Sequence, residues 1–596
     1  MEYIDKYAPR NKEKPMSTNL SKQKREDLLS KIEAIRAHIK TKLYDENAGK
    51  LFGYLNELAA QVNGQKYGLV FEEHRESIDD TLEKNLPVLT EEKKLFVDGG
   101  GELNFLLEGD NLASLQLLEK THKGKIDVIY IDPPYNTGKE DFIYDDNYIE
   151  KDDSFKHSKW LSFMKKRLKM AHSLLKDNGI IFISIDDNEC APLKLLCDEI
   201  FGEDNRLSLH HIQVRYENKS LNEKKAFQEV CEYVLIYEKK MGCFDANRPS
   251  ENYSLDSFCF EIKETGKPKK CTIAGKTVEI FQKNQWEISK VESGLDKLKE
   301  TWITGSIYSG TGHGTTYQKI VEPRLEEDGY QSLYKIYGLG EDGLGYRYFT
   351  NPAKQGATKG KMFTGVPLSK KKEIENGNAI KYKTISNLYD FSPDFGNIRH
   401  EGGVPFGSGK KPVKMLKQFI NYHQEKDIIV LDFFAGSGST GHATLALNNE
   451  DGGKRKFILC TNNENNICRD ITYQRIKNVI TKDGLPGSLK YFKVDFVPVA
   501  EKEYYEYADK LLLHIRELVE LENAVDFKRD KSVAIVLTEE ELAEFTNKIE
   551  ETGPTMTKIL YLGHDVLLSK EQKSLFKKRG VKVKIIPQYY YPELNG

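Results

Sequence analysis

The chain has 596 residues, of which 30% are charged and 39% hydrophobic, a length and composition that predict several globular domains. It holds no run of roughly eighteen apolar residues and no secretory signal, which excludes an ordinary membrane helix. Its eight cysteines include no Cys-x-x-Cys pair, which excludes a disulfide framework and a zinc ribbon. We therefore expect a cytoplasmic protein without a metal site. The net charge of −3 lacks the basic excess of many nucleic-acid binders, but a local basic groove is enough to bind DNA.

The first hundred residues are predicted to be mainly helical. An apolar stripe at helical spacing is formed by Leu28, Ile32, Ile35 and Ile39. Such a stripe packs on the chain's own core or docks a second subunit, and both readings stay open. A run of three glycines at 99–101 marks a boundary, so we place a helical N-terminal region at 1–100.

A strand and a proline-rich turn come next. Residues 126–131 are apolar and β-branched, which predicts a buried parallel strand. The tetrapeptide Asp132-Pro133-Pro134-Tyr135 follows at its carboxyl end, where open α/β sheets bind ligands. Asp132 and the Pro133 carbonyl can accept hydrogen bonds from an exocyclic amine, the Tyr135 ring can stack, and the prolines stiffen the turn. We therefore predict a pocket for a planar, amino-bearing ring such as a nucleobase.

The next predicted elements complete the first half of this sheet domain, and a long insert follows them. An amphipathic helix at 160–175 and a buried strand at 180–185 complete a first half-domain at 101–205. Residues 206–400 form a long insert that becomes irregular and rich in Gly, Tyr and Lys, with a mobile loop predicted at 305–314.

A second motif ends the strand predicted at 428–432. The glycine-rich sequence Phe434-Ala435-Gly436-Ser437-Gly438-Ser439-Thr440-Gly441 joins that strand to a helix-like stretch. Strand, glycine turn and helix form the architecture of a nucleotide-type cofactor site, because glycines let the backbone approach the ligand. No Gly-Lys-Ser/Thr follows, so a phosphate loop is excluded. The chain then ends with strand patterns at 533–537, 559–562 and 581–586, which predict a small α/β C-terminal module at 501–596.

The two motifs together resemble the S-adenosylmethionine-dependent amino-methyltransferases. The tetrapeptide precedes the glycine motif by about 300 residues, an order similar to the β class of DNA adenine-N6 methyltransferases. The segments 130–138, 109–111 and 181–189 narrow the resemblance to the modification (Mod) subunits of type III restriction-modification systems. This resemblance implies an α/β, Rossmann-like methyltransferase sheet whose second half is 401–500, with 206–400 as the target-recognition insert.

The resemblance also implies the residues of the site. The catalytic residues would be Asp132, Pro133, Pro134 and Tyr135. The residues that bind S-adenosylmethionine would be Asp110, Asp132, Lys411, Asp432, Phe434, Gly436, Ser437, Gly438, Thr440 and Glu464. Among them, Asp110 would contact the adenine end, Glu464 the ribose, and Lys411 would help close the methionine end.

The implied function is methylation of a flipped-out adenine in double-stranded DNA, with a second copy of the chain and a restriction (helicase-nuclease) subunit as possible partners and no membrane. Related enzymes that methylate cytosine N4 more often place Ser before Pro-Pro-Tyr, so Asp132 favours adenine. Methylation of RNA or of a protein glutamine, a solitary or other phage-defence methyltransferase, and a catalytically silent DNA-binding subunit remain as alternatives.

Overall fold

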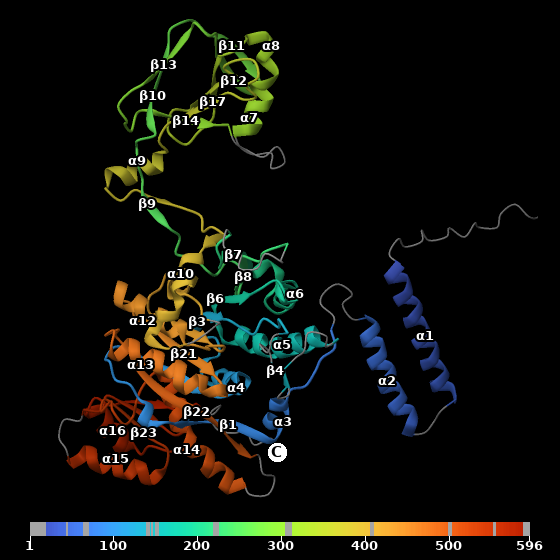
Figure 1. The fold of residues 1–596 in the computed structure, drawn as a ribbon, viewed down its shortest axis with the longest axis vertical. Helices are drawn as coiled ribbons and strands as arrows, with labels where there is room; N and C mark the ends of the chain where they lie inside the picture. Colours follow the sequence, from blue (N-terminus) through green and yellow to red (C-terminus); the bar gives the residue numbers. More distant parts are fainter. Residues whose placement is uncertain are drawn as a thin grey trace, which may run out of the picture. The chain divides into compact units, whose positions relative to one another are not determined.

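The computed structural model describes residues 20–42, 46–63, 71–138, 143–144, 147–148, 154–217, 226–303, 313–405, 410–498, 504–551 and 556–587 (Figure 1). The chain divides into two compact units. The first unit combines residues 1–245 with 387–596, and the second unit is Ala246–Ser386.

A ten-stranded sheet, counted over the described residues, forms the centre of the first unit. Its strands in spatial order are β1 (Asn85–Glu91), β22 (Ser488–Pro498), β2 (Leu103–Glu108), β21 (Lys456–Thr461), β20 (Ile429–Asp432), β3 (Ile126–Ile131), β6 (Leu175–Ile185), β8 (Cys231–Glu238), β7 (Arg206–Gln213) and β19 (Leu388–Asp390). From β22 to β6 all neighbours are parallel, whereas β8 runs antiparallel to both β6 and β7. The predicted strands at 126–131, 180–185 and 428–432 are thereby confirmed, and the sheet is the predicted α/β type.

Helices cover both faces of this sheet. On one face, α4 (Asn111–His122), α5 (Lys156–Leu174), α6 (Cys190–Phe201) and α14 (Tyr504–Asn523) share one apolar core with the strands. On the other face lie α11 (Val413–Ile420), α12 (Ser439–Asp451) and α13 (Tyr473–Thr481). Side chains alternate along a strand, so in β3 Ile129 joins the first core while Tyr130 stacks with Phe419 of α11. Both faces of β3 are buried, which explains why apolar side chains occupy both faces of the strand.

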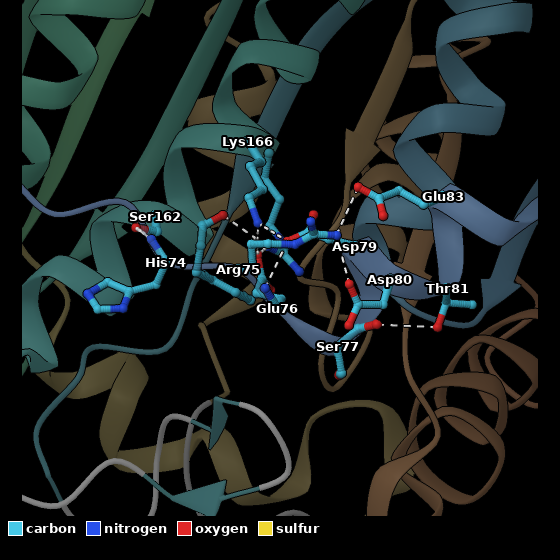
Figure 2. A network of polar contacts seen from close by, with 12 residues as sticks. His74, Arg75, Glu76, Ser77, Asp79, Asp80, Thr81, Glu83, Ser162 and Lys166 are labelled. Atoms are coloured by element: carbon cyan, nitrogen blue, oxygen red, sulfur yellow. Dashed lines mark hydrogen bonds and ion pairs between the residues drawn. The ribbon is translucent and has the colours of Figure 1, made fainter. Parts of the chain in front are cut away.

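The helix α5 matches the amphipathic helix predicted at 160–175. Its polar side anchors α3 (Ser77–Lys84) and the segment before it, as Figure 2 shows. The His74 amide donates to Ser162 Oγ at 2.9 Å, and Lys166 forms ion pairs with Glu76, at 3.3 Å, and with Asp79 (Figure 2). These contacts tie residues 74–79 to the helix that follows the proline-rich turn.

The second unit is built on an eight-stranded sheet within its described residues. Its order is β11 (Lys269–Ile273), β12 (Lys276–Phe281), β15 (Leu333–Tyr337), β16 (Tyr346–Thr350), β17 (Lys361–Thr364), β14 (Leu298–Trp302), β10 (Phe258–Glu264) and β13 (Trp286–Lys290). All of the pairings are antiparallel. The prediction of a largely irregular insert was wrong, because several of these strands are short and largely exposed, as in β11 and β13, and so carry little apolar pattern.

This unit is also narrower than the insert predicted at 206–400. The strands β7, β8 and β19 lie within that range but extend the central sheet of the first unit. Most of the mobile loop predicted at 305–314 lies outside the described residues, and His313 already begins α7 (His313–Ile320).

The first two helices and the last three strands each form a smaller packed cluster. The helices α1 (Leu20–Lys42) and α2 (Glu46–Asn63) pack through Ile32, Ile39 and Leu55, whereas Leu28 and Ile35 of the predicted stripe are about half exposed. The strands β23 (Val533–Val536), β24 (Ile559–Leu562) and β25 (Lys582–Ile585) form a parallel sheet with α15 (Glu539–Glu551) and α16 (Lys570–Lys578), as their pattern predicted. None of the helices in the described part of the chain combines the length and the hydropathy of a membrane-spanning segment.

Candidate active site

The proline-rich turn (Asp132–Tyr135) and the glycine loop (Phe434–Gly441) meet at one edge of the central sheet. Strands β3 and β20 are parallel neighbours with Val128 opposite Val430 and Ile129 opposite Leu431, so their carboxyl ends coincide. Both motifs line a single cavity of about 710 Å³. Segments about 300 residues apart in the sequence thus form one pocket at the position where open α/β sheets bind ligands.

Asp132 lies in a network with Tyr135 and Lys411. Its Oδ1 accepts a hydrogen bond from the Tyr135 hydroxyl at 2.9 Å and lies 3.1 Å from Lys411 Nζ. Burial raises the pKa of Asp132, and the neighbouring Lys411 ammonium opposes that rise. Lys411 therefore favours the ionised carboxylate, which is the form that accepts hydrogen bonds from an amino group.

Glu232, at the start of β8, completes this network and was missed by the sequence analysis. Its Oε2 accepts a hydrogen bond from Lys411 Nζ at 3.0 Å and also lies 3.0 Å from the Tyr135 hydroxyl, whose single proton Asp132 and Glu232 share. Burial alone would lower the pKa of Lys411, but Asp132 and Glu232 together raise it. A shared lysine thus bridges two carboxylates across the Tyr135 side chain, which it also contacts at 2.7 Å.

The glycine loop is organised by Asp432, the last residue of β20. Asp432 accepts hydrogen bonds from the Phe434 amide at 3.0 Å and from Thr440 Oγ1 at 2.6 Å. Burial raises the pKa of Asp432 to about 7, although both hydrogen bonds act in the opposite direction. Gly436 and Gly438 have φ of 46° and 75°, the left-handed region that suits glycine. The loop then enters α12 at Ser439.

Arg475 of α13 supports the loop from behind and was also missed. It is fully buried, and its Nη1 donates to Ser439 Oγ at 2.8 Å and to Ser437 Oγ at 3.2 Å. Its Nη2 lies 3.4 Å from Glu401, whose carboxylate also accepts from the Val413 amide at the start of α11. Burial lowers the pKa of Arg475 to about 10. One guanidinium thus links the glycine loop to the helix that follows Lys411.

Most of the predicted site residues line the cavity. They are Asp132, Pro133, Pro134, Tyr135, Lys411, Asp432, Phe434, Gly436, Ser437 and Thr440. Gly438, Asp110 and Glu464 are not among the lining residues. Glu464 is exposed just beyond β21.

The Asp110 side chain has a structural task in this conformation. Its Oδ1 accepts from the Leu112 and Ala113 amides at 2.7 and 3.3 Å and so caps α4. The neighbouring Asn111 donates to the Phe433 carbonyl at 3.0 Å. This bond places the Gly109-Asp110-Asn111 segment beside the glycine loop even though Asp110 does not reach the cavity wall.

Comparison with known proteins assigns the family. A model of the N6/N4 methyltransferase family, described as DNA methylase, matches residues 126–474, which is more than half of the chain and spans both motifs. The chain belongs to this DNA methylase family.

Curated relatives agree with this membership. The type III restriction-modification enzyme StyLTI Mod subunit of Salmonella typhimurium is 33% identical over 409 residues, which cover 63% of this chain and 55% of that protein. The EcoPI Mod subunit of Escherichia phage P1 is 29% identical, covering 61% and 58%. The type II methyltransferase M.KpnI of Klebsiella pneumoniae is 32% identical, covering 65% and 90%. The chain therefore spans little more than half the length of the type III relatives but most of M.KpnI.

Proposed function

We propose that this protein is a site-specific DNA methyltransferase that transfers a methyl group from S-adenosylmethionine to N6 of an adenine. One observation carries the proposal: the proline-rich turn, which offers acceptors for an amino group, and the glycine loop, which suits a nucleotide-type cofactor, line the same cavity. A pocket of about 710 Å³ can hold both a cofactor and a base.

The residues of the glycine loop fit the cofactor. Among the described residues, a Cβ on Gly436 would have only the Phe434 carbonyl oxygen within 4 Å, at 3.8 Å, so the backbone is open to close approach on that side. Asp432, Phe434 and Ser437 border the same wall. When bound there, S-adenosylmethionine would supply an electrophilic methyl group on a positively charged sulfur. Asp432 would attract that positive charge, whereas Asp132 is already paired with Lys411.

The proline-rich turn would receive the base. An adenine inside a duplex cannot reach the cavity, so it must be flipped out, which costs a few kcal/mol. Stacking on the Tyr135 ring would offset about 1–3 kcal/mol of that cost. Asp132 and the Pro133 carbonyl would accept hydrogen bonds from the N6 amino group, which favours a pyramidal nitrogen with a free lone pair. The carboxylate of Asp132 would also stabilise the positive charge that develops on N6.

We further propose that the chain is the modification and recognition subunit of a type III restriction-modification system, in which the second unit (Ala246–Ser386) reads the DNA sequence. The similarity to two type III Mod subunits supports this role. Cleavage would then require a separate restriction subunit, and the protein would act in the cytoplasm. The broad coverage of M.KpnI favours a second candidate, a methyltransferase that works without a type III nuclease partner.

Transfer of a tritiated methyl group to DNA, RNA and protein tests the proposal. We expect label on DNA as N6-methyladenine, and N4-methylcytosine instead would contradict the adenine assignment. Asp132→Ala should lower kcat by at least about a thousandfold while the cofactor Kd changes less than about threefold. Single-molecule sequencing of DNA from a host expressing the protein would give the sequence context and show whether one or both strands are modified.

A further inference from the structure

A second polar cluster lies directly behind the proline-rich turn. Asn136, the residue after Tyr135, is fully buried and has a φ of 57°. Its Nδ2 donates to Glu189 Oε1 at 2.5 Å and to the Lys156 carbonyl at 3.2 Å. Glu189, which precedes α6, is also fully buried, and its Oε1 lies 2.6 Å from Nδ1 of the half-exposed His157. Two motifs noted in the sequence, 130–138 and 181–189, are thus joined by one side-chain contact.

Two buried oxygen atoms in this cluster have no hydrogen-bond partner within the described structure, namely Asn136 Oδ1 and Glu189 Oε2. An amide oxygen and an ionised carboxylate oxygen both only accept hydrogen bonds, so neither can satisfy the other. Unsatisfied buried acceptors are strongly unfavourable, above all on a charged group. The side chains that carry them already share one hydrogen bond, from Asn136 Nδ2 to Glu189 Oε1.

A single proton on Glu189 Oε2 would give both of these oxygen atoms a hydrogen-bond partner. The carboxylic acid would donate to Asn136 Oδ1 while its Oε1 continues to accept from Asn136 Nδ2, which gives a paired acid and amide with one bond in each direction. His157 would then be neutral and donate from Nδ1 to the same Oε1. The opposite assignment, an imidazolium beside a carboxylate, leaves both orphaned oxygens without a donor.

We propose that Glu189 is a positioning residue that works as a neutral acid, pairing with the Asn136 amide and thereby fixing Tyr135 beside Asp132. The inference deepens the proposed methyl transfer and rests on it. The pair fixes the residue after Tyr135 in a left-handed conformation that non-glycine residues rarely adopt. From the other side, Trp160 Nε1 donates to the Pro134 carbonyl at 2.7 Å. The turn is therefore held at both of its last two peptide units.

The surroundings of Glu189 affect its pKa in opposite directions. Burial raises the pKa of Glu189, while the Asn136 bond, His157 and the Lys156 ammonium oppose that rise. The N-terminus of α6 also favours the ionised form. Because the folded-state pKa is raised, the neutral acid is present below that pKa and is lost as the pH rises through it.

Two substitutions of similar size separate the neutral-acid role from the alternatives. Glu189→Gln keeps one acceptor and places an N–H donor where the acid has its O–H, so it imitates the protonated form. Glu189→Leu keeps the volume and removes both bonds. At low pH we expect kcat of Glu189→Gln within about twofold of the wild type and kcat of Glu189→Leu about tenfold lower, with an unchanged cofactor Kd. The wild-type kcat should fall as the pH rises and Glu189 ionises. The kcat of Glu189→Gln should not fall over that pH range.

Hydrogen exchange of the amides at 135–138, measured by mass spectrometry, provides a second readout that does not need methyl transfer. We expect slow exchange in the wild type and in Glu189→Gln, and faster exchange in Glu189→Leu. If Glu189→Gln resembles Glu189→Leu in both exchange and kcat, Glu189 acts as an anion and the inference is overturned. If the exchange results hold but the wild type transfers no methyl group to DNA, the proposed function fails while the neutral pair stands.

Discussion

Replacement of Lys411 by Met would test the electrostatic logic of the site most directly. Lys411 Nζ lies 3.1 Å from Asp132 and 3.0 Å from Glu232, and its side chain is only 7% exposed. Met has a similar length and no charge, so Lys411→Met would leave two carboxylates side by side, linked only through the Tyr135 hydroxyl. Asp132 would lose the cation that opposes the effect of burial on its pKa.

The magnitude follows from these distances. Two unit charges 3.1 Å apart attract each other by about 5 kcal/mol at an effective dielectric constant of about 20, and removal of one partner from a buried ion pair costs about 3–5 kcal/mol. We therefore expect Lys411→Met to lose about 3–5 kcal/mol of unfolding free energy at neutral pH. The loss should shrink at lower pH, because protonation of Asp132 removes an uncompensated charge. Removal of Lys411 also raises the pKa of Asp132, so the fall of kcat at acid pH should begin at a higher pH than in the wild type.

The assay can follow the first unit alone. Trp160 is buried and bonded to the Pro134 carbonyl, whereas the other two tryptophans, Trp286 and Trp302, belong to the second unit. In a background with both of these changed to Phe, tryptophan fluorescence during urea unfolding reports the region of the turn. Lys411→Met combined with Glu232→Gln is the matched control and should recover part of the loss, with a coupling of at least about 1 kcal/mol. A loss below about 1 kcal/mol together with an unchanged pH profile would refute this reasoning.

Three further outcomes follow from the glycine loop. Cofactor affinity, measured by calorimetry, should increase as the pH is raised through about 7, because ionised Asp432 attracts a cation. Thr440→Val removes a hydrogen bond that lowers the pKa of Asp432, so it should move the midpoint to higher pH. An affinity independent of pH would argue against the role of Asp432. Arg475→Met should weaken cofactor binding by about tenfold, because Ser439 and the loop lose their donor, and equal affinity in both proteins would contradict the support role. Gly438→Ala should cost about 1–2 kcal/mol of stability in thermal unfolding, because its φ is 75°, and an unchanged melting temperature would show that the loop relaxes.

The sequence predicted those parts of the structure whose signals are local. The strand at 126–131, the helix after it and the strand before the glycine loop each carry their own apolar pattern, and β3 begins and ends where that pattern does. The same reasoning failed for the second unit, whose strands are short and often charged, as in Lys269–Ile273 and Trp286–Lys290. Such strands form because their neighbours pair with them, and pairing is not visible in a single segment.

Of the candidate site, the sequence predicted the residues that belong to the two motifs and missed those that reach the site from other elements. Glu232 and Arg475 reach it from other strands and helices, so their contribution depends on the order of strands in the sheet and on the position of α13. A partial signal existed for Glu232, an acid at the very start of an apolar strand. For Asp110, a local rule competed with the resemblance: an aspartate immediately before a helical stretch is a preferred N-cap, and that is how the structure uses it.

The balance of charge in the cavity agrees with the proposed chemistry. Its walls contain the carboxyl groups of Asp132, Glu232 and Asp432, with Lys411 and Arg215 as the cations among the lining residues. Lys411 is already paired with the first two, so an ionised Asp432 remains to face a positively charged sulfur. Transfer of the methyl group leaves a neutral thioether, which these carboxylates attract less than the sulfonium. The Asp432 carboxylate that would favour cofactor binding would therefore also favour release of the spent cofactor, and Lys411 favours the ionised form of Asp132.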